Sequence, residues 1–508
     1  NVDYPESGMG INATLSADHD AYIPGLKKLV DAIHNHGTKA IMQLLHTGPL
    51  RSEGISSVQP VAASAIPSRL LPKTPPRELT TQEVEDLIEK HAQAARRIQQ
   101  AGFDGVEIGA GQGYLVSTFL SPLTNKRTDR FGGDTPEARA TFLLEIIRRI
   151  KQKVGRNGFI IGCKPSVEQG VPGGITLEDS KRTAPLLVEA GVNMFNAWAW
   201  WHEAPGHTTI SAVPRGAFVY LAEALKEVVS VPVGAVCRIN DPRLAARIIA
   251  ERRADLVIMG RALLADPYLP KKAAEGDLDD IRMCIACNTC LDEEFSALLT
   301  AGVERHNPNP PVCSLNAEIG MEGEQKMKPA EAPKKVLVVG GGPAGMEVAR
   351  VASLRGHKVT LWESKDRLGG SLIPSAVPPH KEEIDGLLNY LTYQMKKLNV
   401  KVELNKGTTP EAVLKEEADE VVIAIGASHI IPKIPGVEGE NVSTAIELLT
   451  GRKGVGEKVV IIGGGMGGCE TAEFLASKGK KVTIVEILSR IARDLGVTNR
   501  GAMRERIK

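Results

Sequence analysis

A glycine-rich unit occurs twice in the chain and constrains its fold more than any other feature. The first copy is KKVLVVGGGPAGMEVARVASLRGHKVTLWE, starting at residue 334, and the second is EKVVIIGGGMGGCETAEFLASKGKKVTIVE, residues 457–486. In each copy a short apolar strand runs into glycines, then into a helical pattern and a second strand. Such alternation predicts parallel strands covered by helices in the second half of the chain.

Each copy also carries the spacing G-x-G-x-x-G and ends its second strand with a glutamate. The first glycine makes a tight turn, the second lets the backbone approach a pyrophosphate, and the third lets helix and strand pack closely. The helix N-terminus faces the anion, and the glutamate is placed to accept hydrogen bonds from ribose hydroxyls. A glycine-rich turn without a ligand would have to explain this coincidence twice. The predicted dinucleotide-binding residues are Gly340, Gly342, Gly345 and Glu363 in the first copy, and Gly463, Gly465, Gly468 and Glu486 in the second.

The first half of the chain alternates apolar runs with amphipathic helical patterns, which again predicts parallel strands. A (β/α)8 TIM barrel needs eight strands and six runs are visible, so we expect that N-terminal strands are missing. An open doubly wound sheet is the alternative. One helical pattern spans residues 81–102, with Thr81 as its expected N-cap. The six strand-like runs are 39–45, 105–109, 159–164, 194–200, 232–236 and 256–260.

The changes of pattern along the chain divide it into four segments of an α/β protein. A barrel is expected over 1–275, and a cysteine-bearing segment and linker over 276–333. Rossmann-like dinucleotide-binding domains follow, one part over 334–452 and a partial one over 453–508. Since the second glycine unit is followed by few residues, we expect this last domain to be incomplete at its C-terminal side.

Three cysteines crowd into the stretch RMCIACNTC. Cys284, Cys287 and Cys290 are spaced C-x-x-C-x-x-C, and Cys313 follows. Four thiolates can hold a zinc ion or an iron–sulfur cluster. Zinc sites usually pair two C-x-x-C knuckles, so this spacing favours a 4Fe-4S cluster, although zinc stays open. The other cysteines are predicted to pack in the core and are Cys163, Cys237 and Cys469.

Composition excludes several classes of function. The formal net charge is +1, so nothing points to nucleic acid or to a charged membrane surface. No apolar run reaches the length of a membrane-spanning helix, which needs about 18 or more residues. Seven cysteines in 508 residues do not indicate a disulfide scaffold, so a reducing cytoplasmic setting is expected.

Several stretches together resemble the Old Yellow Enzyme superfamily, in its iron–sulfur flavoprotein branch. They are DGVEIGAGQGYLVSTFLSPLTNKRTDRFGG (104–133), MQLLHTG (42–48), GRALLADPYLPKKAAEG (260–276) and CIACNTCLD (284–292). That branch holds 2,4-dienoyl-CoA reductase, enoate reductases and trimethylamine dehydrogenase, and it joins an FMN barrel, a 4Fe-4S cluster and an FAD/NAD(P) module in this order. The tandem glycine units likewise resemble the FAD and NAD(P) domains of glutathione-reductase-like flavoproteins. Together these resemblances imply an FMN-binding oxidoreductase barrel over 1–275, an FAD-binding part over 334–452 and a partial NAD(P)-binding part over 453–508. Residues 200–218 and 238–242 are similar to 2,4-dienoyl-CoA reductase in particular.

The resemblance implies cofactor roles for barrel residues. Gln43 would hydrogen-bond the pyrimidine edge of FMN. Gly260 and Arg261, after the last strand, would bind the FMN phosphate, with Arg238 near it. Lys164 stands where the family usually has an arginine against the flavin ring, and it lacks the bidentate geometry of arginine. For the dinucleotide at the second glycine unit, NADH is favoured over NADPH because Glu486 would repel a 2′-phosphate.

The resemblance also implies an acid pair and an activity. Tyr114, assisted by His202, would protonate the substrate carbon while reduced FMN gives hydride from the opposite face. Electrons would pass from NADH to FAD, the 4Fe-4S cluster, FMN and then an activated C=C bond of an enoyl- or dienoyl-CoA-type or enoate substrate. Many members carry a histidine pair where this chain has Gly109 and Gln112, which disfavours a simple cyclic-enone reductase. The cysteine spacing also departs from that of 2,4-dienoyl-CoA reductase.

Two other readings remain open. One alternative hypothesis is an amine dehydrogenase or demethylase of the trimethylamine dehydrogenase type, which passes electrons to a carrier protein. Another is an electron-transfer module without a substrate of its own. A homo-oligomer is possible in each case.

Overall fold

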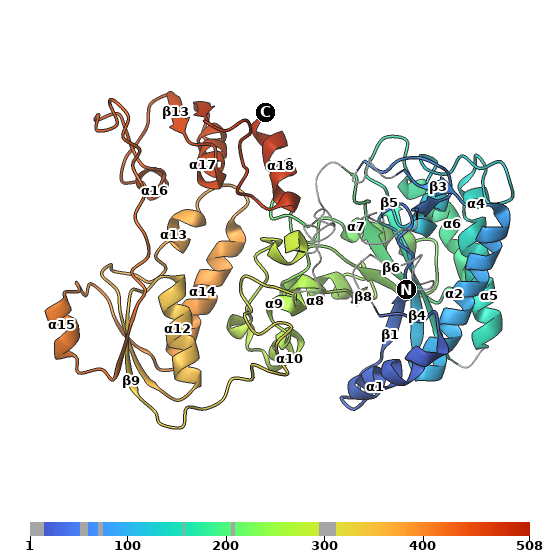
Figure 1. Cartoon of the computed structure of the whole chain (residues 1–508), viewed down its shortest axis with the longest axis horizontal. Coiled ribbons are helices and arrows are strands. Elements are labelled where there is room, and N and C mark those ends of the chain that lie inside the picture. Colours follow the sequence, from blue (N-terminus) through green and yellow to red (C-terminus); the bar gives the residue numbers. More distant parts are fainter. Residues whose placement is uncertain (1–14, 51–58, 70–74, 156–157, 205–208, 294–310) are drawn as a thin grey trace. The chain divides into compact units, whose positions relative to one another are not determined.

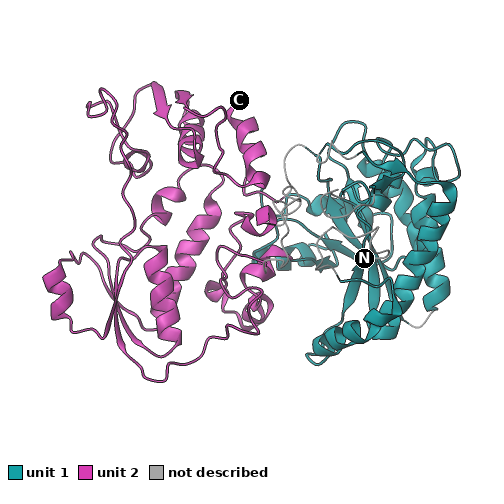
Figure 2. Cartoon of the chain, in the orientation of Figure 1, with its two compact units in different colours: residues 1–208, 214–259, 294–309 teal, residues 209–213, 260–293, 310–508 magenta. Residues whose placement is uncertain are grey.

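The computed structural model describes residues 15–50, 59–69, 75–155, 158–204, 209–293 and 311–508. The chain folds into two compact units (Figure 2). Unit 1 comprises residues 1–208, 214–259 and 294–309, and unit 2 comprises residues 209–213, 260–293 and 310–508.

The described part of unit 1 is built on a parallel sheet of six strands in the order β1-β4-β5-β6-β7-β8. Strands that follow one another around the helical connections are neighbours in the sheet, so every crossover steps in the same direction. A barrel wall has this order, whereas a doubly wound sheet reverses its order at a switch point. The predicted barrel-type sheet is therefore confirmed, and each of the six predicted runs forms a strand. The strands are β1 (Ile41–Leu44), β4 (Gly105–Ala110), β5 (Ile160–Glu168), β6 (Met194–Ala199), β7 (Val233–Ala235) and β8 (Leu256–Val257).

Helices cover one face of this sheet, where α2, α5 and α6 lie side by side (Figure 1). The longest, α2 (Thr81–Ala101), begins at the N-cap Thr80 and not at Thr81 as predicted. Thr80 and Glu83 form a capping box, because each side chain accepts from the other residue's backbone N–H. The helix ends at Gly102, whose φ of 103° is the left-handed conformation common after a helix.

The remaining elements of unit 1 are shorter. Phe119 and Phe142 are fully buried between helices and sheet, with ring centroids 4.3 Å apart. The two-residue strands β2 (Val61–Ala62) and β3 (Arg77–Glu78) pair with each other. The other helices are α1 (Ile23–His34), α3 (Leu115–Leu120), α4 (Pro136–Arg139), α5 (Thr141–Val154), α6 (Leu177–Ala190), α7 (Val219–Lys226), α8 (Pro242–Ala250) and a single 3-10 turn, η1 (Asp20–Tyr22).

Unit 2 contains both glycine turns, each between a strand and a helix. Its larger sheet has the order β11-β10-β9-β12, which is the 3-2-1-4 order of a Rossmann-type half. The second turn lies between β13 and α17, and β13 pairs in parallel with β14. The Rossmann-like prediction is confirmed. The strands are β9 (Lys335–Val339), β10 (Lys358–Trp362), β11 (Lys401–Glu403), β12 (Glu420–Ile423), β13 (Lys458–Ile462) and β14 (Lys481–Val485).

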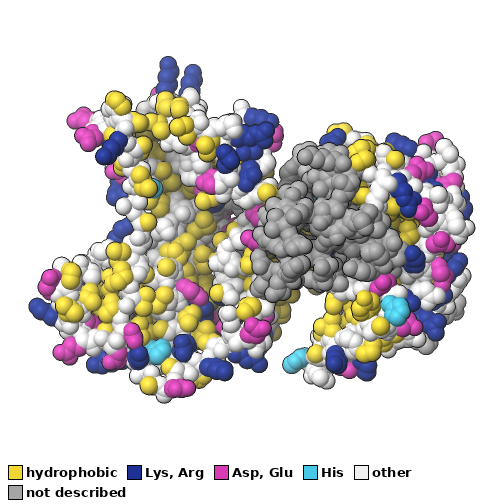
Figure 3. Space-filling view, viewed as in Figure 1, with side chains coloured by type: hydrophobic (Ala, Val, Ile, Leu, Met, Phe, Trp, Pro, Cys, Tyr) yellow, Lys and Arg dark blue, Asp and Glu magenta, His cyan; other side chains and the backbone are white. Residues whose placement is uncertain are grey.

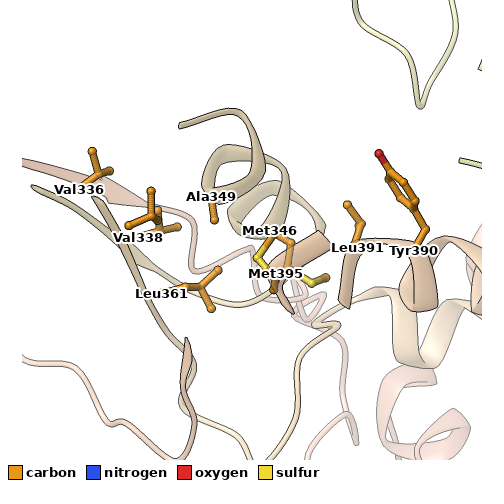
Figure 4. Packing of buried hydrophobic residues seen from close by; sticks show 9 residues of the cluster. Val336, Val338, Met346, Ala349, Leu361, Tyr390, Leu391 and Met395 are labelled. Atoms are coloured by element: carbon orange, nitrogen blue, oxygen red, sulfur yellow. The ribbon is translucent and has the colours of Figure 1, made fainter. Parts of the chain in front are cut away.

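The core of the larger sheet forms where α12 and α14 pack on it (Figure 4). Alternate residues Val336 and Val338 of β9 face Met346 of α12, and all three are less than 8% exposed. Met395 of α14 completes the contact. The helices of unit 2 are α9 (Arg261–Ala265), α10 (Leu269–Glu275), α12 (Pro343–Leu354), α13 (Leu372–Ser375), α14 (Glu382–Lys397), α15 (Pro410–Lys415), α16 (Ala445–Leu449), α17 (Met466–Ser477), α18 (Val497–Ile507) and a 3-10 turn, η2 (Leu278–Asp280).

The smaller sheet of unit 2 leaves apolar side chains exposed. Val460 and Ile462 of β13 and Val485 of β14 are each more than half exposed, and hydrophobic side chains are visible on the surface around β13 (Figure 3). None of the helices in the described part of the chain combines the length and the apolar composition that crossing a bilayer requires.

Two adjacent glycines of α17 provide a matched test of the second turn. A Cβ on Gly468 would lie 1.9 Å from the carbonyl oxygen of Gly463, whereas a Cβ on Gly467 would meet nothing within 4 Å. We expect Gly468→Ala to lower the free energy of unfolding of unit 2 by roughly 2 kcal/mol or more, since overpacking costs about 1–3 kcal/mol. Gly467→Ala should be neutral or stabilise by up to ~1 kcal/mol, because alanine favours a helix. Denaturant unfolding of the two variants measures the difference, and equal effects would contradict this packing.

Candidate functional site

The carboxyl ends of β4 and β6 bring Tyr114 and His202 together. Tyr114 is the N-cap of α3, four residues after β4 ends, and His202 lies three residues after β6. A backbone bridge between Gln112 and Trp201 joins the two loops. The Tyr114 hydroxyl oxygen lies 3.4 Å from His202 Nε2, and the rings meet edge to face with centroids 5.5 Å apart. Both side chains are partly exposed.

Non-glycine residues with positive φ gather at the same ends of the strands. They are Gln112 after β4, Trp200 after β6, and Cys237 and Arg238 after β7, with φ between 54° and 73°. Each such residue costs of order 1–3 kcal/mol and persists only where its surroundings impose it, most often at functional sites. In barrels of this type the catalytic face is the carboxyl end of the strands. The strain therefore marks the same face as the tyrosine–histidine pair.

A charged layer crosses the sheet on one face. Gln43 on β1 donates from Nε2 to Glu107 Oε1 on β4 at 2.6 Å, and Asn196 on β6 donates to Glu107 Oε2 at 3.3 Å. Lys164 on β5 lies in the same layer, with its Nζ 4.4 Å from the ring centroid of Trp198. Burial lowers the pKa of Lys164, and the neighbouring Glu107 opposes that shift. The structure thus brings Gln43 and Lys164 to one carboxylate, Glu107, which the sequence analysis had not singled out.

The residues predicted to hold the FMN phosphate belong to different units. Arg238, in unit 1, follows β7 and is only 6% exposed. Gly260 and Arg261, in unit 2, form the N-cap and first residue of α9. The Arg261 Nη1 atom donates to Asn288 Oδ1 at 2.5 Å and to the carbonyl oxygen of Thr209 at 2.8 Å. Arg261 therefore lies against the cysteine-bearing loop.

The four cysteines of the predicted cluster gather within unit 2. Thr289 Oγ1 lies 2.9 Å from Ser314 Oγ, and Cys287 Sγ lies 3.3 Å from the same Ser314 oxygen. These contacts bring Cys313, the neighbour of Ser314, to the loop that holds the other three thiols. All four side chains are partly exposed.

The charges around these thiols show how closely they are grouped. Burial raises the pKa of the Cys290 thiol to about 11, while the Arg261 guanidinium pulls it down and the thiols of Cys284, Cys287 and Cys313 add to the rise. Burial likewise raises the pKa of Cys284, again against Arg261. Within the described ranges, however, no three or more His, Cys, Asp or Glu side chains converge as ligands of one metal ion.

The two glycine turns share one construction. A Cβ on Gly345 would lie 1.8 Å from the carbonyl oxygen of Gly340, the same clash that Gly468 avoids in the second turn. Glu363 Oε2 accepts from the N–H of Gly341 at 2.8 Å. Glu486 accepts from the N–H of Gly464 at 2.6 Å. Each glutamate thus holds its own turn closed, a contact that the predicted ribose role does not include.

A cavity of about 130 Å³ in unit 2 lies between the cysteine loop and the second turn. Cys287 borders it on one side, and Met466, the first residue of α17, borders it on the other. Lys381 and Glu470, also in its lining, form an ion pair with Nζ and Oε1 2.5 Å apart. The sequence carried no signal for this cavity, because its lining residues are far apart in the chain.

Fold and site together define a flavin-dependent oxidoreductase in which a TIM-barrel domain is joined to a Rossmann-like pyridine nucleotide domain. Residues 3–280 match the model of the NADH:flavin oxidoreductase / NADH oxidase family, and residues 334–508 match that of the pyridine nucleotide-disulphide oxidoreductases. The first match spans more than half of the sequence. The chain belongs to the NADH:flavin oxidoreductase / NADH oxidase family, and the predicted resemblance to Old Yellow Enzyme-type flavoproteins is confirmed.

Individual relatives extend over nearly the whole chain. It is 42% identical to an NADH oxidase of Thermoanaerobacter brockii, over 97% of this chain and 75% of that protein. It is 36% identical to a cinnamate reductase of Clostridium sporogenes, over 91% and 70% respectively. The solved 2-naphthoyl-CoA reductase with 2-naphthoyl-CoA matches with a TM-score of 0.90 and 35% identity, over 96% and 75%. An N,N-dimethylglycine/sarcosine dehydrogenase of Chromohalobacter salexigens is 33% identical, over 96% and 70%.

Proposed function

We propose that this protein reduces an activated C=C bond with electrons from NADH, in a substrate of the enoyl-CoA or enoate type. The observation that carries the proposal is the Tyr114–His202 pair, 3.4 Å apart at the carboxyl ends of β4 and β6. A proton donor is what reduction of a conjugated double bond requires besides hydride. The cinnamate and 2-naphthoyl-CoA reductases among the relatives act on conjugated acids or thioesters, which supports the substrate class.

The chain offers residues suited to each implied cofactor. For FMN these are Gln43, Lys164 and Arg238, with Gly260 and Arg261 proposed for its phosphate. FAD would lie at the first glycine turn, and NADH at the second. When bound, the flavins, a 4Fe-4S cluster and the nicotinamide supply hydride and one-electron transfer. The proposed cluster ligands are Cys284, Cys287, Cys290 and Cys313, and the grouping of the four thiols supports this assignment.

Tyr114 and His202 have distinct roles in the proposed mechanism. The Tyr114 hydroxyl gives its proton to a substrate carbon. This carbon is either adjacent to the carbon that receives hydride or conjugated with it through a further double bond. His202 Nε2 holds that hydroxyl in place and returns a proton to it afterwards. A separation of 3.4 Å is long for such a bond, and catalytic hydrogen bonds commonly shorten once substrate is bound. Seven cysteines in 508 residues do not indicate a disulfide scaffold, which supports a reducing, cytoplasmic location.

Glu107 would orient Gln43 toward the flavin. The amide nitrogen of Gln43 is engaged by the Glu107 carboxylate, so its carbonyl oxygen is left to accept from a flavin N–H. Glu107→Gln should raise the Kd for FMN by about 5- to 30-fold, the effect of losing ~1–2 kcal/mol of hydrogen bonding to a charged group. Flavin fluorescence titration measures it. Glu178→Gln, at an exposed position of α6, serves as the control, and equal FMN affinity in both variants would contradict the orienting role.

A substrate screen tests the proposed function. The holoenzyme, reduced anaerobically with NADH, is mixed with enoyl-CoA thioesters, free enoates and methylated amines, and saturated products are measured. We expect oxidation of the flavins by a thioester or an enoate. If instead amines reduce the flavins without NADH, the protein is an amine dehydrogenase, the function of the C. salexigens relative. If neither class reacts while NADH still reduces the flavins, the chain transfers electrons without a substrate of its own.

A further inference from the structure

Unit 2 contains two glycine turns, the first before α12 and the second before α17. At each turn, the loop that follows the second strand crosses the turn. In the first, the N–H of Gly369 donates to the carbonyl oxygen of Gly341 at 2.9 Å. In the second, the N–H of Ala492 donates to the carbonyl oxygen of Gly464 at 2.7 Å. Both donors have positive φ, 130° for Gly369 and 55° for Ala492. The two loops are therefore equivalent in position and can be compared residue by residue.

The two glycine turns differ at the N-terminus of the helix that follows each of them. In the first, α12 begins with Pro343, which has no N–H, and the loop passes it as Gly370, where a Cβ would come within 2.8 Å of a turn atom. In the second turn, α17 begins with Met466, whose backbone nitrogen donates to both carboxylate oxygens of Asp494 at 2.9 Å. Asp494 Oδ2 lies 3.0 Å from where a Cβ of Gly465 would be. Of these two turns, only the second has a carboxylate of the protein, that of Asp494, at the N-terminus of its helix.

A dinucleotide places its pyrophosphate at the same N–H groups and beside the same second glycine of the fingerprint. Two anions cannot share that donor, and their charges repel each other. We propose that Asp494 is an affinity-determining residue of the nicotinamide dinucleotide site, whose carboxylate occupies the pyrophosphate position and is displaced when the dinucleotide binds. This inference rests on the proposed function.

The surroundings of Asp494 allow its side chain to rotate away from the turn while the loop backbone keeps its position. Asp494 itself is exposed. Ala492, two residues earlier, is fully buried with Cys469 and Met503 in one apolar cluster, which Leu495 joins from the other side. The loop is therefore anchored on both sides of the aspartate, and only rotation of its side chain is needed to clear the turn.

The test compares Asp494→Asn with the unchanged holoenzyme. Asparagine still caps the helix but carries no charge. We expect the Kd values for NADH and for ADP to fall by about two- to fivefold. This is the effect on binding expected from the interaction of one anion with a helix N-terminus. Adenosine, which has no phosphate, should bind equally to both proteins. Glu447→Gln is the control, because Glu447 occupies the first turn of α16 in the same unit and glutamine preserves its capping box.

Isothermal titration gives outcomes that separate the two proposals. If the unchanged protein binds neither NADH nor ADP, the proposed function itself fails. If it binds them but Asp494→Asn binds them equally or more weakly, the displacement of Asp494 is wrong. If the asparagine variant does not fold, Asp494→Ser, which keeps a cap without charge, takes its place and must meet the same expectation. A gain that extends to adenosine would also overturn the inference, because that ligand has no pyrophosphate.

Discussion

Replacing Tyr114 by phenylalanine should slow alkene reduction by about 10²–10⁴-fold, the contribution of a general acid. The change removes one hydroxyl and keeps the ring that packs edge to face on His202. Reduction of the flavins by NADH should persist at its normal rate, since it does not need this proton. Stopped-flow measurement of the two half-reactions separates them, with NADH in the first and the alkene in the second.

The controls for this prediction lie in the same unit. Tyr22→Phe changes an exposed tyrosine and should leave both half-reactions unaltered. His202→Gln should give a smaller loss than Tyr114→Phe, and the loss should vary with pH, because glutamine can hold the hydroxyl but cannot return a proton. Full alkene reduction by Tyr114→Phe would reject the assignment of Tyr114, and the proton would then have to come from solvent.

Most of the fold could be predicted because its signals are local. Each strand of the six-stranded sheet in unit 1 is an apolar run bounded by turn residues, and each glycine turn predicts the strand before it and the helix after it. The strand bounds shift by a few residues from the predicted runs, and the N-cap of α2 is Thr80 where Thr81 was predicted. The correct cap also had a local signal, since Thr80 stands three residues before Glu83 in a capping-box spacing. The two-residue strands β2 and β3 are too short to show any periodicity.

The site was only partly predictable because its geometry depends on distant partners. Sequence alone could name Tyr114 and His202, but their approach follows from the places of β4 and β6 on either side of β5. No pattern marks Glu107 as the partner of Gln43, because their pairing arises from the register of β1 on β4. The position of Asp494 over the second turn likewise depends on the path of the loop after β14. Sequence patterns therefore predict the secondary-structure elements and the candidate residues. The contacts between those residues depend on the strand order and on the paths of the loops.

Replacing Cys290 by serine should remove most iron and sulfide from the protein. Serine has nearly the same shape but is a poor ligand for iron, and Cys290 lies close to the other three thiols. We expect NADH-dependent alkene reduction to fall by more than ~100-fold, since changes to outer-shell partners of a metal site already cost about 10–100-fold. Chemical analysis of iron and sulfide and the visible absorption of the cluster measure the first effect, and steady-state turnover measures the second.

Cys163→Ala is the matched control, because Cys163 is fully buried in β5 of unit 1 and is not one of the four grouped thiols. It should cost stability through a small cavity but leave iron, sulfide and electron transfer unchanged. Two outcomes would contradict the cluster. Zinc in place of iron in the unchanged protein would mean that the thiols hold a single ion. Normal turnover by Cys290→Ser after complete loss of iron would mean that electrons reach the barrel without passing the four cysteines.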